Sequence, residues 1–199
     1  MWDERYATEA YVYGEAPNAF LASCLERLRP GDRALAVADG EGRNGVWLAE
    51  QGLDVVSVDA SAVGLEKARR LAGKRGVFPE FIQADLFAWD WPEAAFDVVA
   101  AIFIQFAGPG DRPRLFESMK RSLKPGGALI LQGYRPEQVA LGTGGPPAPE
   151  NMYTETMLRD AFADFEIAHL RAHDDVIEEG AGHSGLSALI DLVALKPDA

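Results

Sequence analysis

Short apolar runs alternate with longer segments of helical periodicity through most of the chain. Runs with the length and flanking residues of buried strands lie at residues 34–38, 55–58, 81–82, 98–104 and 128–131. Segments with apolar residues at helical spacing run from Asn44 to Gly52, from Ser61 to Gly73 and from Asp111 to Lys124. This alternation predicts a parallel sheet with helices on both of its faces.

The C-terminal part of the chain shows a different pattern. After a short helix predicted at residues 154–162, two apolar runs at 165–171 and 187–195 read as strands joined by a glycine-rich turn. A connection this short cannot hold a crossover helix, so the two strands must be antiparallel to each other. The whole pattern predicts an α/β fold with a doubly wound, mostly parallel seven-stranded sheet that contains one antiparallel strand.

The N-terminal residues lack a clean period. Residues 1–16 carry one tryptophan and three tyrosines among acidic residues, which predicts an irregular arm. Residues 17–28 then show an apolar helical stripe that includes Cys24, and Pro30-Gly31 ends it. We expect one domain, residues 1–199, made of this arm and helix (1–30) and an α/β core (31–199).

Two segments have an unusual composition. Residues 133–152 are rich in glycine and proline, and a loop this long in a compact domain is usually functional or mobile. A cluster of basic residues is interpreted as a solvated helix face, and its members are Lys67, Arg69, Arg70, Lys74 and Arg75.

The acidic composition restricts the partners. The chain carries a formal net charge of −12 at pH 7, and such a surface repels nucleic-acid phosphates and anionic lipid headgroups. Three histidines and one cysteine cannot build a Cys/His metal cage. The N-terminus does not read as a signal peptide, and no apolar run approaches the ~18 residues of a membrane span. We therefore expect a cytoplasmic protein with no nucleic-acid or membrane partner and no metal.

The stretch from Ala34 to Asp59 reads as one βαβ unit with a glycine-rich turn. Gly40 and Gly42 follow its first strand, a helix begins near Asn44, and Asp59 closes the second strand. Glycine lets the backbone approach a ligand closely, and a helix N-terminus favours an anionic group. The acid can accept hydrogen bonds from two ribose hydroxyls. Such a unit binds a cofactor that contains a nucleoside.

Two cofactors fit this unit. Gly40-x-Gly42-x-x-Gly45, with Asp59 about 20 residues further on, satisfies the dinucleotide fingerprint. The same stretch resembles the first two motifs of class I S-adenosylmethionine-dependent methyltransferases. Those motifs read hydrophobic-Asp/Glu-hydrophobic-Gly-x-Gly-x-Gly, followed by an acid at the end of the second strand.

Later stretches support the methyltransferase resemblance. Gln83-Ala84-Asp85-Leu86 looks like the family's adenine motif, and residues 123–127 before an apolar strand look like its late motif. A parallel sheet with one antiparallel strand is also the family's architecture. The resemblance covers residues 20–196 and implies S-adenosyl-L-methionine as the cofactor. The Gly-Arg-Asn helix start resembles the tellurite and thiopurine group, which implies a small-molecule substrate.

The chain departs from the family's pattern at its first strand. Ala36 stands where an acid usually helps to hold the cofactor's methionyl ammonium, and Ala38 replaces the first glycine. Asp39 follows three residues after Ala36 and could substitute for the missing carboxylate. If it does not, we expect weaker cofactor binding or a different ligand.

The candidate site residues cluster at predicted strand ends, because ligands of open α/β sheets bind outside the carboxyl ends of the strands. Those assigned to the cofactor are Asp39, Gly40, Gly42, Arg43, Asp59, Ala60, Asp85, Leu86 and Gln105. Candidate substrate-binding residues are Tyr13, Tyr134, Arg135 and Tyr153. His183, in the turn between the last two strands, is the candidate catalytic base.

Most of these residues also have a simpler interpretation. Asp59 could cap the next helix, and Asp85 could be a turn residue. Arg43 could be solvated in the first turn of its helix, and Gln105 could satisfy local backbone groups. His183 could simply be exposed, and the N-terminal tyrosines could serve only for packing.

Three functions are compatible with these motifs. The favoured one is methyl transfer to a small molecule, which needs alignment, exclusion of water and, for a weak nucleophile, a base. The second is a nicotinamide-dependent oxidoreductase that uses the same glycine loop. The third is a cofactor-binding protein without methylation, which the alanine at position 36 suggests. The acceptor and the oligomeric state cannot be read from the sequence.

Overall fold

The computed structural model describes residues 1–198 and contains one seven-stranded sheet in the order β3-β2-β1-β4-β5-β7-β6. Strand β7 is antiparallel to both of its neighbours, and the other neighbouring pairs are parallel. The predicted α/β fold with one antiparallel strand is confirmed. The strands are β1 (Arg33–Val37), β2 (Asp54–Asp59), β3 (Glu80–Gln83), β4 (Phe96–Ile102), β5 (Leu123–Tyr134), β6 (Glu166–Glu179) and β7 (His183–Leu195).

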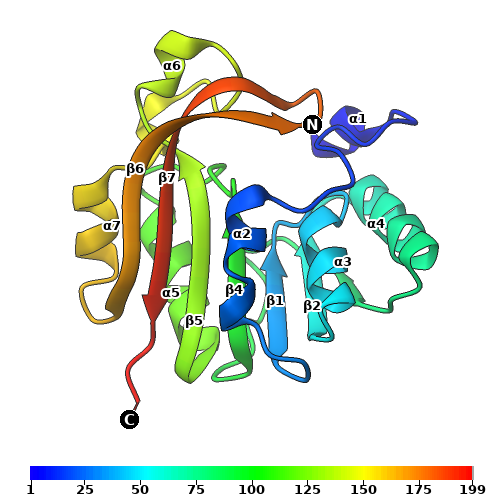
Figure 1. Ribbon diagram of the computed structural model, residues 1–199, viewed down its shortest axis with the longest axis horizontal. Helices are drawn as coiled ribbons and strands as arrows, with labels where there is room; N and C mark the ends of the chain where they lie inside the picture. Colours follow the sequence, from blue (N-terminus) through cyan, green and yellow to red (C-terminus); the bar gives the residue numbers. More distant parts are fainter. Residues whose placement is uncertain (199) are drawn as a thin grey trace.

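Helices cover both faces of this sheet (Figure 1). Helices α2, α3 and α4 lie on one face, and α5 lies on the other. The helical elements are α1 (Trp2–Tyr6), α2 (Ala19–Ser23), η1 (Leu25–Arg27), α3 (Arg43–Glu50), α4 (Ala62–Arg75), α5 (Arg112–Ser122), α6 (Gln138–Leu141), η2 (Pro149–Asn151) and α7 (Glu155–Ala161). In residues 1–198 no helix combines the length and the hydropathy that a bilayer crossing requires.

The central strands are buried on both faces, which explains their nearly continuous apolar runs. Leu35 of β1 packs in one cluster with Leu115 of α5, whereas its neighbour Ala34 packs in another with Leu21 of α2. Successive side chains of a strand point to opposite faces, so each strand contributes to both clusters. The two layers of helices hold the sheet rigidly and fix the positions of the strand ends.

Two segments reach over the carboxyl ends of the parallel strands. The β6–β7 hairpin bends over this end of the sheet towards α1 (Figure 1). It is longer than the two predicted strands, because pairing continues as far as Glu179 and His183. The N-terminal arm meets the hairpin there, where the amide of Gly182 donates to the carbonyl oxygen of Val12 at 3.0 Å.

Several local predictions are wrong. The arm is not fully irregular, because residues 2–6 form α1. The predicted helix at 17–28 begins after its N-cap Asn18 and is divided into α2 and η1. Residues 133–152 contain α6 and η2 rather than loop alone. These short elements depend on contacts with distant segments, which periodicity along the chain does not reveal.

The basic cluster of α4 is also not uniformly solvated. Arg69, Arg70, Lys74 and Arg75 are exposed, but only 1% of the surface of Lys67 is accessible. Its ammonium forms an ion pair with Glu41 beneath the N-terminal arm. A lysine is almost never buried without a partner, so this position has a specific structural purpose.

Candidate functional site

A cavity of about 580 Å³ lies at the carboxyl ends of the parallel strands, beneath the arm and the hairpin tip. Its size is typical of small-molecule sites. The predicted site residues that line it are Tyr13, Asp39, Gly40, Arg43, Asp59, Ala60, Asp85, Leu86, Gln105, Tyr134 and His183. Residues far apart in the sequence therefore come together here, as expected for ligands of open α/β sheets.

The glycine loop between β1 and α3 requires glycine at two positions. Gly40 has a φ of 58°, and a Cβ there would lie 2.6 Å from the hydroxyl of Tyr6. Gly42, the N-cap of α3, has a φ of 87°, and its Cβ would lie 2.5 Å from that of Ala68 in α4. Gly42 therefore faces α4 rather than the cavity. Ala38 is also left-handed, with a φ of 49°, at the place of the family's first glycine.

Asp59 holds this loop and faces the cavity. Its Oδ2 accepts from the amide of Gly40 at 2.8 Å, and its Oδ1 accepts from the amide of Ser61 at 2.7 Å. The side chain that caps α4 is that of Ser61, which accepts from the amide of Gly64. Burial raises the pKa of Asp59 above its ordinary value, although the amide bonds oppose this. Each carboxylate oxygen has a further lone pair for a ligand hydroxyl.

Asp39 lies beside the position of the missing acid. Its Oδ2 accepts from the hydroxyl of Ser57 at 2.8 Å, and the amide of Gly45 donates to both of its oxygens. Ser57 is the β2 residue paired with Ala36 in the sheet register. The Asp39 carboxylate therefore reaches back towards the place of the usual acid. Burial raises the pKa of Asp39 to about 7, against the effect of these hydrogen bonds.

The raised pKa of Asp39 predicts two opposite pH dependences. Because the folded-state pKa is about 7 and the ordinary value is 3.8, the unfolded chain loses this proton first. The contribution of Asp39 to the free energy of unfolding should therefore decrease as pH rises from about 4 to about 7. If Asp39 pairs with the ammonium of the cofactor that the sequence resemblance implies, affinity for S-adenosylhomocysteine should instead increase about tenfold between pH 6 and pH 8, since only the charged carboxylate attracts a cation.

Calorimetry and urea unfolding over this pH range would measure both trends. In Asp39→Asn, the decrease in the free energy of unfolding that Asp39 causes and the increase in ligand affinity with pH should both disappear. If the affinity of this variant keeps the wild-type step near pH 7, Asp39 does not act as the counter-charge for the ammonium.

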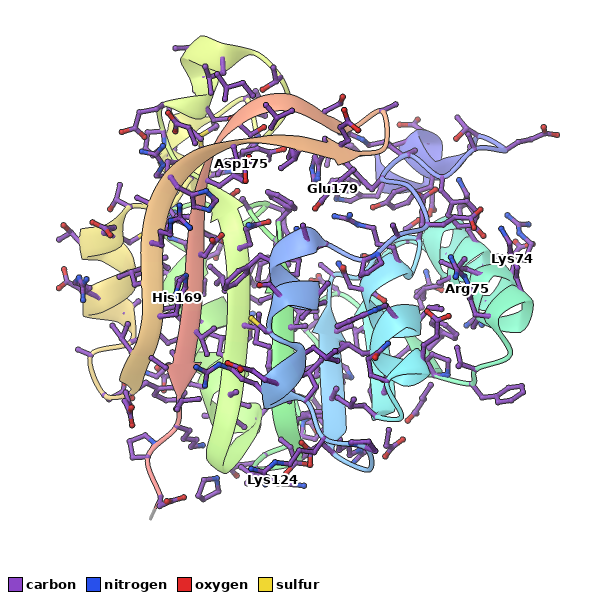
Figure 2. All side chains as sticks on the ribbon, viewed as in Figure 1. Lys74, Arg75, Lys124, His169, Asp175 and Glu179 are labelled. Carbon is purple, nitrogen blue, oxygen red and sulfur yellow. The ribbon has the colours of Figure 1, made fainter. Side chains whose placement is uncertain are left out.

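Arg43 is buried and paired, so the interpretation that it is solvated is wrong. Its Nη2 donates to the Oε2 of Glu179 at 2.6 Å, and both side chains are more than nine-tenths buried. Figure 2 shows Glu179 near the end of the hairpin that covers the glycine-loop side. Glu179 also accepts from the side-chain amide of Asn18 at 2.9 Å. This pair fastens the hairpin tip to the start of α3.

Asp85 makes the local contact of its simpler interpretation, whereas Gln105 binds backbone groups of Tyr134, 29 residues later in the chain. Asp85 is exposed and accepts from the amide of Phe87 at 2.9 Å, as a turn residue does. Gln105 accepts from the amide of Tyr134 at 2.7 Å and donates to its carbonyl oxygen at 2.8 Å. Both residues still line the cavity. Gln105 therefore positions the start of the loop after β5 as well as the cavity wall.

His183 lies inside an aromatic cluster rather than exposed in a loop. Its ring centroid is 4.2 Å from that of Phe103, 4.4 Å from that of Tyr13 and 5.5 Å from that of Tyr134. Burial and the nearby cation of Arg43 lower its pKa to about 3. A group with this pKa is neutral at physiological pH and a poor proton acceptor near pH 7. The electrostatics therefore do not support His183 as a general base.

Two candidate substrate residues do not line the cavity. Arg135 donates to the carbonyl oxygens of Leu189 and His173 and forms an ion pair with Asp174, so it is occupied by the hairpin. Tyr153 is only 1% exposed and packs in the core, with its ring 5.7 Å from that of Phe116. Neither side chain is placed to contact a ligand in the cavity.

Several cavity-lining residues have no counterpart among the predicted ones. Trp2, Arg5 and Tyr6 come from the arm, where the sequence shows no periodicity. Phe103 follows β4 with a φ of 55°, which is unusual for a bulky residue and is often found at functional sites. Phe103 lies near the end of the most apolar run of the sequence, residues 98–104, and this position is the signal that could have identified it as a cavity residue.

Comparison with known proteins agrees with this geometry. Residues 34–127 match the model of a methyltransferase domain. The chain is 35% identical over 106 residues to a demethylmenaquinone methyltransferase of Thermus thermophilus, covering 52% of this chain and 48% of the relative. It is 32% identical over 125 residues to a probable thiol methyltransferase of Arabidopsis thaliana, covering 59% and 52%. The chain thus spans about half the length of these relatives.

A solved structure shares the complete fold. TehB from Haemophilus influenzae superposes with a TM-score of 0.73 at 18% identity, covering 98% of this chain and 65% of that one. The domain match also selects the methyltransferase interpretation of the glycine loop over the dinucleotide one. The cofactor of such domains is S-adenosyl-L-methionine. Residues 34–127 therefore form a methyltransferase domain of the S-adenosylmethionine-dependent type, and the fold of the chain is that of the class I enzymes.

Proposed function

We propose that the protein transfers the methyl group of S-adenosylmethionine to a small-molecule acceptor whose nucleophilic atom is already unprotonated. The observation that supports this is one cavity whose two halves differ in chemistry. Carboxylates at or just beyond the ends of β1, β2 and β3 line one half, namely those of Asp39, Asp59 and Asp85. The rings of Tyr13, Phe103 and His183 line the other half.

The acidic half suits the cofactor. In this proposal Asp59 accepts from the ribose hydroxyls, and Asp85 with the backbone of Leu86 binds the adenine. Asp39 faces the methionyl ammonium in place of the acid absent at Ala36. Hydrogen bonds to an ionised carboxylate are stronger than hydrogen bonds between two neutral groups.

The aromatic half suits a small acceptor that needs no base. Burial lowers the pKa of His183 to about 3 and raises that of Tyr134 above its ordinary value. Burial likewise raises the pKa of Tyr13. No side chain of this cluster therefore ionises near neutral pH, and a weak nucleophile such as an alcohol would keep its proton.

This environment also favours the reaction of an acceptor that is an anion. Its attack on the sulfonium removes two opposite charges, and such a step is favoured where water is excluded and the dielectric constant is low. Arg5 and Arg43 are the cations of the cavity lining. The thiol methyltransferase among the relatives is consistent with an ionised sulfur nucleophile.

Transfer of a labelled methyl group to paired thiols and alcohols of the same carbon skeleton would test this function. We expect the thiols to be methylated at a rate that follows their thiolate fraction, and the alcohols to remain unlabelled. His183→Ala should keep that pH profile. Methylation of the alcohols with an inflection near pH 6–7 that His183→Ala abolishes would contradict the proposal. Binding of S-adenosylhomocysteine without any transfer would support the non-catalytic alternative instead.

A further inference from the structure

The N-terminal arm forms part of the wall of the cavity. Trp2, Arg5, Tyr6 and Tyr13 of the arm line it from the side of the glycine loop and the hairpin tip. Tyr6 is 5% exposed, and its hydroxyl lies against Gly40. A ligand in the cofactor half would therefore lie between the strand ends and the arm. The position of the arm thus affects the path by which such a ligand enters and leaves.

One buried ion pair lies under this arm. It joins Glu41, the residue between the two glycines of the loop, to Lys67 of α4. The side chains are 2% and 1% exposed, respectively. Taking two charges out of water is costly, and a buried pair often contributes nothing to stability relative to apolar residues of similar size. Its position inside the cofactor loop therefore needs another explanation.

Both partners of the pair bind the backbone of the arm. The ammonium of Lys67 donates to the carbonyl oxygens of Tyr6 at 3.3 Å, Thr8 at 3.0 Å and Ala10 at 2.8 Å. The hydroxyl of Tyr11 donates to the carbonyl oxygen of Lys67 at 3.0 Å. The residues between α1 and α2 belong to no helix or strand, so these bonds help to fix the course of the chain there.

The carboxylate of Glu41 fixes the following part of the arm. Its Oε2 accepts from the amide of Val12 at 2.8 Å and from that of Tyr13 at 3.3 Å. Tyr13 packs on His183 in the aromatic half, and Tyr6 packs on Gly40 in the cofactor half. The same ion pair therefore places the arm over both halves of the cavity.

We propose that Glu41 and Lys67 are positioning residues that hold the arm closed over the bound cofactor and so set the rate of cofactor exchange. This inference rests on the cofactor-binding part of the proposed function. Glu41 moves with the glycine loop, because it lies between Gly40 and Gly42. Cofactor bound to the loop and the closed arm therefore stabilise each other through one carboxylate.

The chain offers a matched control for this pair. Glu15 of the arm and Lys74 of α4 form a second ion pair at 2.6 Å, which joins the same two segments. Its side chains are 33% and 63% exposed, and Lys74 lies on the outer side of α4 (Figure 2). An exposed pair of this kind contributes little to stability. Replacing Lys74 thus tests whether the loss of any contact between the arm and α4 accelerates cofactor release.

The test is the rate of S-adenosylhomocysteine release, measured by stopped-flow competition on the chain of residues 1–199. Lys67→Met and Glu41→Gln should each accelerate release by at least about tenfold, because each leaves one buried charge without its partner. Lys74→Met should stay within about twofold of wild type. The double variant, with both Lys67→Met and Glu41→Gln, contains no unpaired buried charge. Its acceleration of S-adenosylhomocysteine release should therefore be smaller than the product of the two single accelerations.

A measurement on the wild type supports the same test without depending on folded variants. Hydrogen exchange should show that S-adenosylhomocysteine protects the amides of Val12 and Tyr13, which donate to Glu41. Equal exchange with and without the ligand would overturn the proposal, as would wild-type release rates in folded Lys67→Met and Glu41→Gln. Absence of S-adenosylhomocysteine binding to the wild type would overturn the proposed function as well.

Discussion

Replacing Asp59 with alanine should weaken the binding of S-adenosylhomocysteine by about ten- to a hundredfold. Hydrogen bonds to a charged group contribute about 1.5–3 kcal/mol, and each 1.4 kcal/mol corresponds to a factor of ten in the dissociation constant. The side chain also accepts from the amides of Gly40 and Ser61, so its loss releases the glycine loop to which we assign cofactor binding. Both effects act in the same direction.

Calorimetry can separate these two effects. Asp59→Asn keeps the shape of the side chain and one acceptor oxygen, so we expect a smaller loss than in the alanine variant. Asp54→Ala is the control, because Asp54 begins the same strand with an exposed side chain and forms only a surface pair with Arg33. An Asp59→Ala protein that is folded and binds with the affinity of Asp54→Ala would remove Asp59 from the cofactor site.

Replacing Gly42 with alanine should destabilise the protein by about 2–5 kcal/mol. A left-handed residue with a Cβ costs roughly 1–2 kcal/mol, and overpacking of a tight contact costs about 1–3 kcal/mol more. The added Cβ would lie 2.5 Å from the Cβ of Ala68 and 2.9 Å from its Cα, so α3 and α4 would have to move apart. Urea unfolding measures this loss.

Replacing Gly73 with alanine, in the same region, should have the opposite effect on stability. It lies inside α4 without a positive φ, and a Cβ there would meet no heavy atom within 4 Å. Gly73→Ala should therefore stabilise the protein by about 0.5–1 kcal/mol, which is the usual difference in helix propensity. Equal free energies of unfolding for the two variants would show that the close contact between the loop and α4 is absent in solution.

The order of strands and helices could be predicted because the apolar pattern alone carries it. Strands buried on both faces leave long apolar runs, and the short glycine-rich turn predicted at residues 180–185 required the final antiparallel pair. Part of the cavity lining was also predictable. The positions of Gly40 and Asp59 follow from the spacing of one βαβ unit, which is a local property of the sequence. The division into an arm of 1–30 and a core of 31–199 stays a prediction.

The covering segments were less predictable because their contacts are distant in the sequence. Lys67 lies in an amphipathic helix among exposed basic residues, and only its partner 26 positions earlier explains its burial. Trp2, Arg5 and Tyr6 reach the cavity because side chains of distant segments bind the backbone of the arm, and no periodic pattern in the arm reveals this. The neutral state of His183 likewise depends on burial between rings from three other segments.

A crystal structure with bound S-adenosylhomocysteine would show directly which half of the cavity holds the cofactor. We expect the ribose hydroxyls within hydrogen-bond distance of the Asp59 carboxylate and the methionyl ammonium beside Asp39. The sulfur should face the space bounded by Tyr13, Phe103 and His183, where an acceptor would bind. A ligand whose ribose lies away from Asp59, or whose sulfur points away from the aromatic cluster, would contradict the assignment of the two halves of the cavity.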